Sequence, residues 1–175
     1  MRLLIAAVAA VVFTLPTVAE DKVALTGDNT KITFVGTKPG GKHEGGFKTL
    51  KGGAVVSADG LSKVAVEIDM ESLFSDDPKL TAHLKSPDFF GVKTNPKSKF
   101  ESTKIEKSDK GHTITGNLTL NGKTKEISFP ATITATGGAV KIESSFSIDK
   151  RDFGMEYGGG KIDDKVSIKV SVDAK

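Results

Sequence analysis

The strict alternation of apolar and polar residues is the feature that most constrains the fold of this chain. It is clear over residues 63–70, where Val64, Val66, Ile68 and Met70 occupy every second position. Successive side chains of a strand point to opposite faces, so this period predicts strands with one buried and one wet face. The pattern recurs at residues 113–120, 127–133, 140–148 and 166–172, and more briefly at 32–34. The sequence therefore predicts an antiparallel β domain.

Turn-forming residues separate these segments. Residues 58–60, 108–111, 121–122 and 137–138 supply Gly, Asn and Asp, which tolerate the positive φ of short hairpin loops. Consecutive strands are therefore predicted to be hairpin neighbours in a meander. Two irregularities stand out. The Gly-rich residues 45–56 are predicted to be irregular, and a change of apolar parity between Phe100 and Ile105 predicts a β-bulge.

One segment departs from the strand pattern. Acids precede Pro78, and Leu80 and Leu84 are four residues apart, which predicts a short helix capped by Asp77. Residues 86–91 are expected to start a second helical turn. About eight strands remove their exposed edges most simply by closing into a barrel. The predicted fold is an all-β, eight-stranded antiparallel barrel, with a helical insert near residues 76–91 lying over one end.

The first residues have the layout of a secretory signal. Arg2 precedes an apolar run over residues 3–13, Pro16 breaks the run, and residues 17–19 end in the small residue Ala19. We expect a signal peptide at residues 1–19, cleaved after Ala19, followed by one domain at residues 20–175. An uncleaved membrane anchor is the alternative, but the run is shorter than the ~20 residues needed to span a bilayer.

Composition narrows the function classes. The chain has no Cys, which excludes thiolate chemistry, disulfides and anchoring through a lipidated Cys. The net charge of +3 comes mainly from Lys residues that alternate with acids, as in residues 104–107 and 161–165, and this is typical of a solvated outer face. Beyond residue 19 the only Arg is Arg151, and Trp is absent, which argues against a nucleic-acid partner.

No catalytic or metal-binding constellation emerges from the motifs. His43, His83 and His112 lack the short spacing of a zinc site, and there is no nucleophile elbow or phosphate-cradling loop. Asp88 and Asp152 are interpreted as a cap and a turn residue. We therefore predict no catalytic residue, no metal and no required cofactor, and a protein that is not an enzyme. A secreted hydrolase or metal-dependent enzyme on the same barrel is the alternative.

Four motifs in order carry a family resemblance. They are His-Leu-Lys-Ser-Pro-Asp-Phe-Phe-Gly-Val at residues 83–92, Asn-Pro-Lys-Ser-Lys-Phe-Glu-Ser-Thr-Lys at 95–104, Thr-Gly-Asn-Leu-Thr-Leu-Asn-Gly-Lys-Thr-Lys at 115–125 and Ile-Asp-Lys-Arg-Asp-Phe-Gly-Met at 148–155. Together they resemble the YceI-like family of exported lipid-binding β-barrels, from Gly36 to Val172. Lys150 stands where the family usually has Arg, and Asn121 where His is common.

The resemblance implies an eight-stranded, lipocalin-like barrel in the periplasm or secreted medium. It also implies a long-chain apolar lipid as partner, bound by its polyprenyl tail, such as an isoprenoid lipid or isoprenoid quinone. No membrane span is expected in the domain, and a homodimer is left open. The expected ligand-binding residues are mainly aromatic and aliphatic: Phe34, Phe47, Val66, Ile68, His83, Phe89, Phe90, Phe100, Leu118, Phe129, Phe146 and Phe153.

Three alternatives stay open at this point. The aromatic residues also suit an ordinary filled core, because an eight-stranded barrel either fills itself with side chains or holds one slim ligand. His83 either contacts a ligand head group or caps the mouth of the barrel, and we favour the cap. A protein-interaction module that uses the outer face is a third function class.

Overall fold

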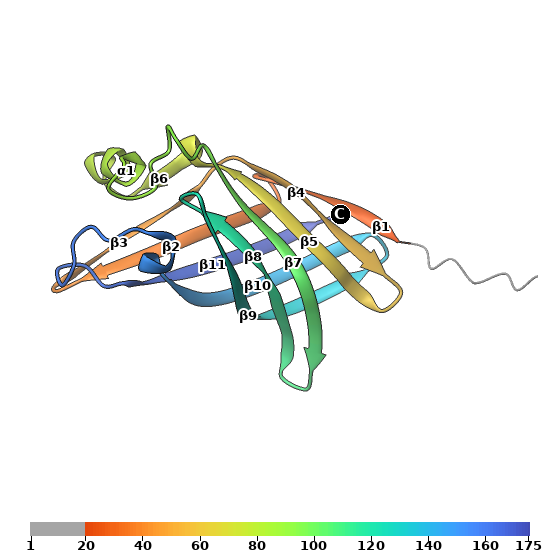
Figure 1. Cartoon of the computed structure of the whole chain (residues 1–175). Coiled ribbons are helices and arrows are strands. Elements are labelled where there is room, and N and C mark those ends of the chain that lie inside the picture. Colours follow the sequence, from red (N-terminus) through yellow and green to blue (C-terminus); the bar gives the residue numbers. More distant parts are fainter. Residues whose placement is uncertain (1–19) are drawn as a thin grey trace, which may run out of the picture.

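The computed structural model describes residues 20–175, which form an antiparallel β-barrel with a helix at one end (Figure 1). The predicted signal peptide, residues 1–19, lies outside the described residues. The strands are β1 (Asp21–Thr26), β2 (Thr30–Lys38), β3 (Gly41–Phe47), β4 (Leu50–Ser57), β5 (Gly60–Asp69), β6 (Leu73–Ser75), β7 (Lys97–Ser108), β8 (Gly111–Leu120), β9 (Lys123–Thr136), β10 (Ala139–Asp149) and β11 (Lys165–Ala174). Helix α1 spans Pro78–Lys85, and 3₁₀ turns η1 and η2 span Met70–Ser72 and Lys150–Phe153.

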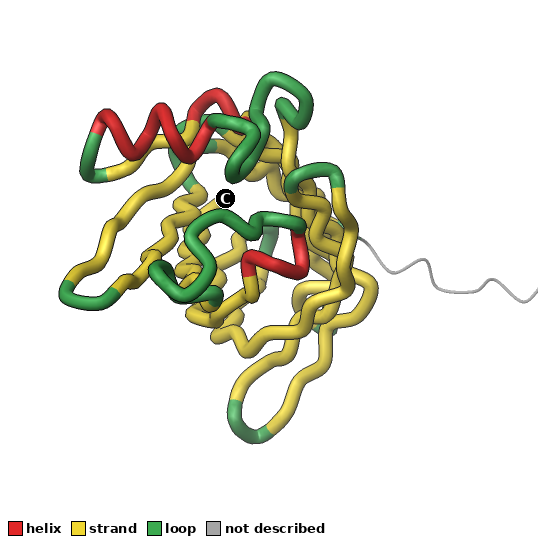
Figure 2. Tube along the Cα trace, turned by 60° about the vertical axis from the view of Figure 1, so that its left-hand side comes forward, coloured by secondary structure: helices red, strands yellow, loops and turns green. Residues whose placement is uncertain are grey.

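The strands pair in the order β1-β4-β5-β7-β8-β9-β10-β11-β2-β3-β6. Strand β1 pairs with β4, whereas β2, which follows it along the chain, pairs with both β11 and β3. The short turn between β1 and β2 therefore links the first strand of this order to β2, near its other end, so that the sheet curls round on itself. Figure 2 shows the strands surrounding a common axis, with α1 and the loop after η2 at one end.

The predicted count of eight strands is wrong, because the described residues form eleven. Two breaks account for most of the difference. The Asn29 side chain accepts a hydrogen bond from the Thr26 amide at 2.9 Å and donates to the Ala24 carbonyl at 3.0 Å, which separates β1 from β2. The Lys48 amide donates to the Ser72 carbonyl at 3.3 Å, which separates β3 from β4. Strand β6 is an additional short partner of β3.

Residues 45–56, predicted to be irregular, instead belong to β3 and β4, apart from the two residues 48–49 between these strands. Their glycines are required by close packing rather than by a loop. A Cβ at Gly45 would collide with the Phe34 ring and the Phe74 carbonyl, and one at Gly52 would collide with the Ala65 carbonyl. Glycine thus lets neighbouring strands and side chains approach closely in this part of the wall.

The predicted turns and bulge are confirmed. Asn121 and Gly122 have φ of 49° and 72°, and Gly137 and Gly138 have 58° and 76°, as tight hairpins require. The register of β7 against β8 shifts between Ser102 and Lys104, where the bulge was expected. Each of these local features positions the next strand beside its predecessor, so the meander follows from the sequence.

Helix α1 is confirmed, with Pro78 in its first turn and the Asp77 carboxylate accepting from the Lys79 amide at 2.7 Å. The second helical turn is not formed, and residues 86–91 are a run of turns. Ser86 has an extended conformation, with ψ of 168°, because the residue before a proline is disfavoured in the helical region. The insert is therefore one helix followed by a turn segment.

Two buried clusters occupy opposite ends of the barrel. The first lies away from α1 and includes small aliphatic residues that fill the space between the strands, which we call the packed end: Val23, Ala54, Val56, Val140 and Ala174. The second cluster lies under α1 and η2, where Leu84, Phe89 and Phe153 are buried. Between them the interior is not filled.

Candidate functional site

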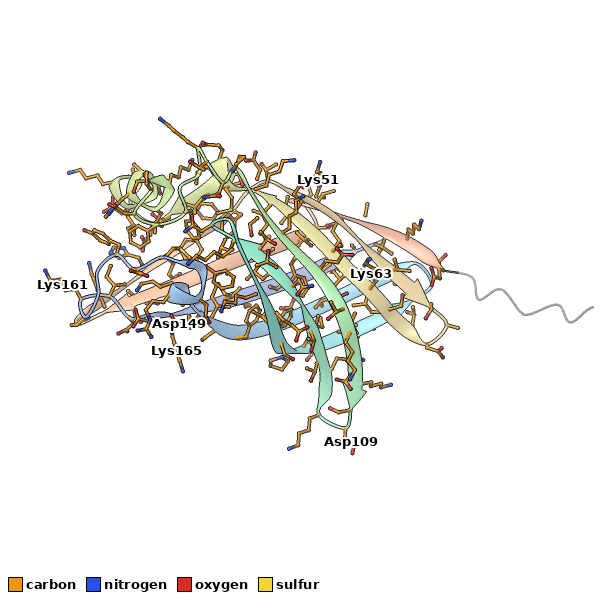
Figure 3. The ribbon with its side chains drawn as sticks, viewed as in Figure 1. Lys51, Lys63, Asp109, Asp149, Lys161 and Lys165 are labelled. Atoms are coloured by element: carbon orange, nitrogen blue, oxygen red, sulfur yellow. The ribbon has the colours of Figure 1, made fainter. Side chains whose placement is uncertain are left out.

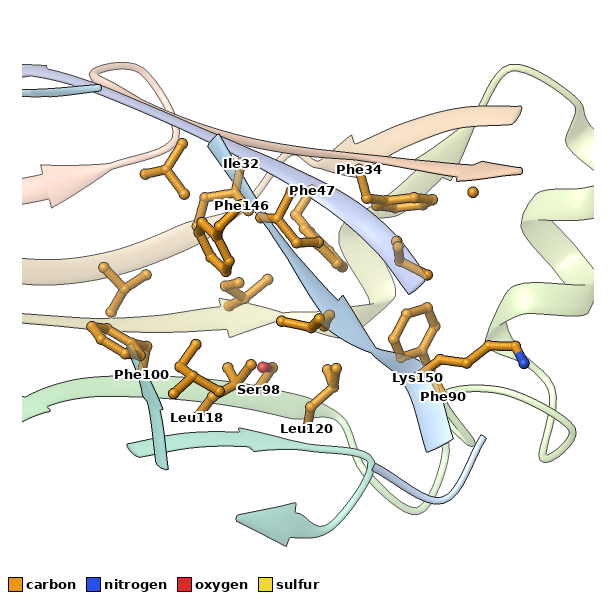
Figure 4. A pocket seen from close by; sticks show the side chains of 18 of the residues that line it. Ile32, Phe34, Phe47, Phe90, Ser98, Phe100, Leu118, Leu120, Phe146 and Lys150 are labelled. Atoms are coloured by element: carbon orange, nitrogen blue, oxygen red, sulfur yellow. The ribbon is translucent and has the colours of Figure 1, made fainter. Parts of the chain in front are cut away.

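The barrel encloses an apolar cavity of about 310 Å³ that reaches from the middle of the interior to the mouth beneath α1 (Figure 4). Cavities of this size accommodate drug-sized ligands. In Figure 4, Phe100 and Phe146 lie deep in the cavity, and Phe90 and Lys150 lie at the end next to α1. Most of the lining comes from the inward face of β2, β5 and β7 to β11, so the alternation in the sequence places it.

Several inward-facing side chains of the cavity wall are only half-buried. Val66 lies between buried Val64 and Ile68 on β5, and Leu118 precedes buried Leu120 by two residues on β8. A side chain on the inner face is reached by solvent only when no other side chain covers it. The interior is therefore hollow here, and the alternative of a core filled by side chains does not describe this end of the barrel.

Aromatic rings form the deep part of the cavity. The rings of Phe129 and Phe146 are stacked, with centroids 4.2 Å apart and planes at 9°, and Phe100 contacts Phe129 at 5.5 Å. Phe34 and Phe47 form a second pair at 5.9 Å, nearer the mouth. Rings have few rotatable bonds, so these pairs give a rigid apolar surface.

The structure brings ten of the twelve predicted residues to the cavity wall. They are Phe34, Phe47, Val66, Ile68, Phe89, Phe90, Phe100, Leu118, Phe129 and Phe146. The other two lie outside it. Phe153 is 1% exposed in η2, packed in the cluster below the mouth, and its carbonyl accepts from the Asn121 side chain at 3.0 Å.

His83 lies on α1 and forms part of a contact across the mouth. Its ring meets Tyr157, from the loop after η2, at 4.7 Å and Phe89 at 5.1 Å, both edge to face. Its Nε2 is 3.1 Å from a carboxylate oxygen of Asp88. These partners hold α1 against the facing loop, so the position of His83 agrees with a cap more than with a wall residue.

Lys150 is a cavity residue that the sequence argument missed. It was noted only as a departure from the usual Arg, yet it is 4% exposed and lines the cavity at its mouth. Its Nζ donates to Asp164 Oδ1 at 2.7 Å. Asp164 belongs to the 161–165 run, which was interpreted as solvated surface. Lys161, Asp163 and Lys165 are exposed, as that interpretation requires. Asp164 is half-buried, so the interpretation is wrong for this one charged residue of the run.

Charged side chains elsewhere cover the outer face, as Lys51 and Lys63 do in Figure 3. Around Glu67, the ammonium groups of Lys97, Lys99 and Lys51 lie 2.7, 3.3 and 3.5 Å from its carboxylate. The hydrogen bond from Lys97 is the main cause that lowers the pKa of Glu67 from 4.5 to about 2. This cluster spans the outer face of β4, β5 and β7, and Lys99 is its only member that borders the cavity.

Other site types were sought in residues 20–175. No three His, Asp or Glu side chains of this part of the chain are grouped so as to hold a metal ion. None of its helices has the length and apolar character needed to cross a membrane. The position of His112 directly after a turn predicts an exposed side chain, but His112 is half-buried, and its Nδ1 has no hydrogen-bond partner among the described residues. Asp88 and Asp152 contact only His83 and Lys125, respectively, as ion-pair partners.

The profile of the YceI-like domain family matches residues 24–174. The chain belongs to this family. It is 32% identical to a UPF0312 protein of Serratia proteamaculans over 137 residues, which are 74% of this chain and 71% of that protein. It is 34% identical to a UPF0312 protein of Pseudomonas aeruginosa over 117 residues, 63% of this chain and 61% of that protein, so the match spans less than two thirds of the Pseudomonas relative.

Solved structures share the fold of this YceI-like chain. BcnA of Burkholderia cenocepacia superposes with a TM-score of 0.75 at 23% identity, covering 83% of this chain and 96% of BcnA. A polyisoprenoid binding domain from Saccharophagus degradans, implicated in plant cell wall breakdown, gives a TM-score of 0.68 at 13% identity, covering 90% and 99%. At these low identities the structural likeness establishes the fold alone, which is a lipocalin-like barrel.

Proposed function

We propose that this protein is an exported binding protein that carries or sequesters a long-chain isoprenoid lipid, with the apolar tail inside the barrel. The observation that carries the proposal is the unfilled cavity of about 310 Å³, walled by inward-facing Phe, Leu, Ile and Val side chains. An apolar chain that enters it covers surface that the protein's own side chains leave open. The proposal is for binding rather than catalysis, with no required cofactor.

Two kinds of comparison support the lipid class. The chain belongs to the YceI-like family, and a solved structure with the same fold is a polyisoprenoid binding domain. An isoprenoid quinone is included in the proposal, because its tail has the same chemistry. The predicted signal at residues 1–19 supports an export route to the periplasm or the medium.

Burial of apolar carbon supplies enough free energy for such binding. Each methylene group removed from water contributes ~0.8 kcal/mol. A tail of several isoprene units is therefore held without any hydrogen bond. Affinity is expected to rise with the number of units until the tail fills the cavity, and then to level off.

Native mass spectrometry of the protein purified from an export-competent host tests the proposal. The expected result is a mature chain that begins at Glu20 and carries a lipid mass that is lost on collisional activation. The lipid-free protein is then titrated with polyprenols of increasing length, and the affinity should rise with length before it levels off. A chain that retains residues 1–19 contradicts the export proposal. Absence of both a copurified lipid and polyprenol binding contradicts the carrier proposal.

A further inference from the structure

We infer that Lys150 is a specificity residue of the cavity, and that its ammonium group binds a neutral hydrogen-bond acceptor, such as a carbonyl oxygen, on the head of the ligand. The inference rests on the proposed function and adds the chemistry of the head group to it. Its starting point is the position of one buried cation at the mouth of a largely apolar cavity (Figure 4).

The other polar groups in the cavity wall have partners or reach solvent. The Ser98 hydroxyl donates to the Thr119 carbonyl at 2.8 Å, and the Thr30 hydroxyl donates to the Asn29 side chain at 3.0 Å. Lys38 and Lys99 are exposed, so water solvates their ammonium groups. Lys150 differs from these two lysines, because only 5% of its side chain is exposed.

The Lys150 ammonium has donors to spare. A lysine ammonium carries three N–H groups, and among the described residues its single hydrogen-bond partner is Asp164 Oδ1 at 2.7 Å. Burial of a charged donor is costly unless its hydrogen bonds are made. An acceptor placed at the mouth of the cavity would therefore take one of the remaining N–H groups.

The backbone holds Lys150 in place before any ligand arrives. Its amide donates to the Asp164 carbonyl at 2.9 Å, and its own carbonyl accepts from the Met155 amide at 3.2 Å. Asp149 caps η2 by accepting from the Arg151 amide at 2.9 Å. A side chain on such a fixed backbone loses little freedom on binding, which favours selectivity.

The surrounding charges favour a neutral acceptor over an anion. Asp164 already neutralises Lys150, and its second oxygen is 3.3 Å from Arg151, which also pairs with Asp149 at 3.0 Å. Asp163, the next carboxylate along the chain, accepts a hydrogen bond from Thr37 at the same mouth. A phosphate would add negative charge beside two carboxylates, whereas a carbonyl adds a lone pair without net charge.

Three ligands with the same polyprenyl skeleton separate the possibilities: a methyl ketone, the corresponding hydrocarbon and the monophosphate. We expect the wild-type protein to bind the ketone about tenfold more tightly than the hydrocarbon, the size of one charge-assisted hydrogen bond. Lys150→Met keeps an unbranched apolar stem, one atom shorter, and removes the donors. It should abolish this preference while hydrocarbon affinity stays within about twofold, because the apolar stem still lines the wall.

The matched control is Lys165→Met, which removes an exposed lysine next to Asp164 and should leave the preference intact. Lys150→Met leaves Asp164 without its buried partner, so the double variant Lys150→Met with Asp164→Asn is measured as well. Circular dichroism and thermal unfolding verify that each variant is folded. If the single variant does not fold, the double variant gives the same comparison of ligands.

The outcomes distinguish this inference from the proposed function. Equal preference for the ketone in wild type and in the folded Lys150 variants overturns the role of Lys150, while tail binding still stands. Tighter, Lys150-dependent binding of the monophosphate overturns the choice of a neutral head group. Failure of all three ligands to bind the wild-type protein overturns the proposed function itself.

Discussion

The two ends of the barrel interior differ in how the same kind of strand fills space. At the packed end, Val140 and Ala174 face each other across β10 and β11 and are 0% and 2% exposed. Farther along the same two strands toward α1, Phe146 and Ile168 face each other but are only half-buried, and both line the cavity. One strand pair thus contributes to a close-packed core and to a hollow.

The difference shows that inward alternation does not by itself specify a filled core. Small residues such as Ala54 and Ala174 let the strands approach at the packed end. Near α1, the insert and η2 cover the barrel instead of filling it, since their buried residues Leu84 and Phe153 pack among themselves and against the rim. A cavity costs stability unless something occupies it, so its presence is a functional signal.

The largest expected effect comes from a charge in the hollow end. Leu118→Asp places a carboxylate in the cavity, where an unpaired charge costs several kcal/mol, so polyprenol affinity should fall by at least about 100-fold. Asn117→Asp, on the exposed outer face of the same strand, should leave affinity unchanged. Titration of both folded variants measures this.

A milder change guards against loss of folding in that experiment. Leu118→Asn makes the wall polar without adding a charge and should weaken binding less than the Asp variant. Equal affinities for the inward and outward variants, all of them folded, would mean that the ligand sits outside the cavity.

The same substitution at both ends tests the packing difference directly. Val140→Ala removes buried methyl groups and opens a void in a close-packed region, so the free energy of unfolding should fall by about 2 kcal/mol. Val66 borders space that is already empty. Val66→Ala should therefore lower the free energy of unfolding of the ligand-free protein by less than about 1 kcal/mol. Urea unfolding of both variants gives the comparison. A cost at Val66 equal to that at Val140 would contradict a hollow interior.

The smallest expected effect is on stability and comes from Glu67 on the outer face of the barrel, which belongs to neither buried cluster. The pKa of Glu67 is lowered to about 2, so its ion pairs stabilise the fold above about pH 4.5 and this contribution is lost as the pH falls toward 2. Glu67→Gln should therefore lower Tm slightly at pH 7 and not at pH 2, with ligand affinity unchanged. Thermal unfolding across this pH range measures it.

Glu126→Gln is the control, because Glu126 is exposed and has no ion pair among the described residues. A Tm difference for Glu67→Gln that stays constant from pH 7 to pH 2 would show that the lysine cluster does not act through the charge of Glu67.

Local patterns in the sequence predicted much of the fold. Strands β5 and β7 to β11, the hairpin turns at Asn121-Gly122 and Gly137-Gly138, the bulge near Ser102 and the cap at Asp77 are each determined within a few residues. The break beside Lys48 was missed because it depends on a bond to the distant Ser72, and the break beside Asn29 because side-chain bonds to Thr26 and Ala24 leave no mark in the alternation. The strand count was wrong for this reason.

The candidate site shows the same division. Phe100, Leu118 and Phe146 could be assigned to the interior by parity, since the side chains of a strand alternate between its faces. Lys150 could not be found this way, because its burial depends on Asp164, which lies beyond the loop that follows η2. A lysine in a charged run has the same local pattern whether it is solvated or buried.

By itself, the sequence determined which side chains face inward, where the chain turns and that the sheet is antiparallel, because these follow from backbone geometry over neighbouring residues. Only the tertiary structure decided that Val140 meets close neighbours while Val66 faces empty space. It also decided that Lys150 lies at the mouth with Asp164. Such features depend on the distances between segments far apart in the chain, which a local period does not contain.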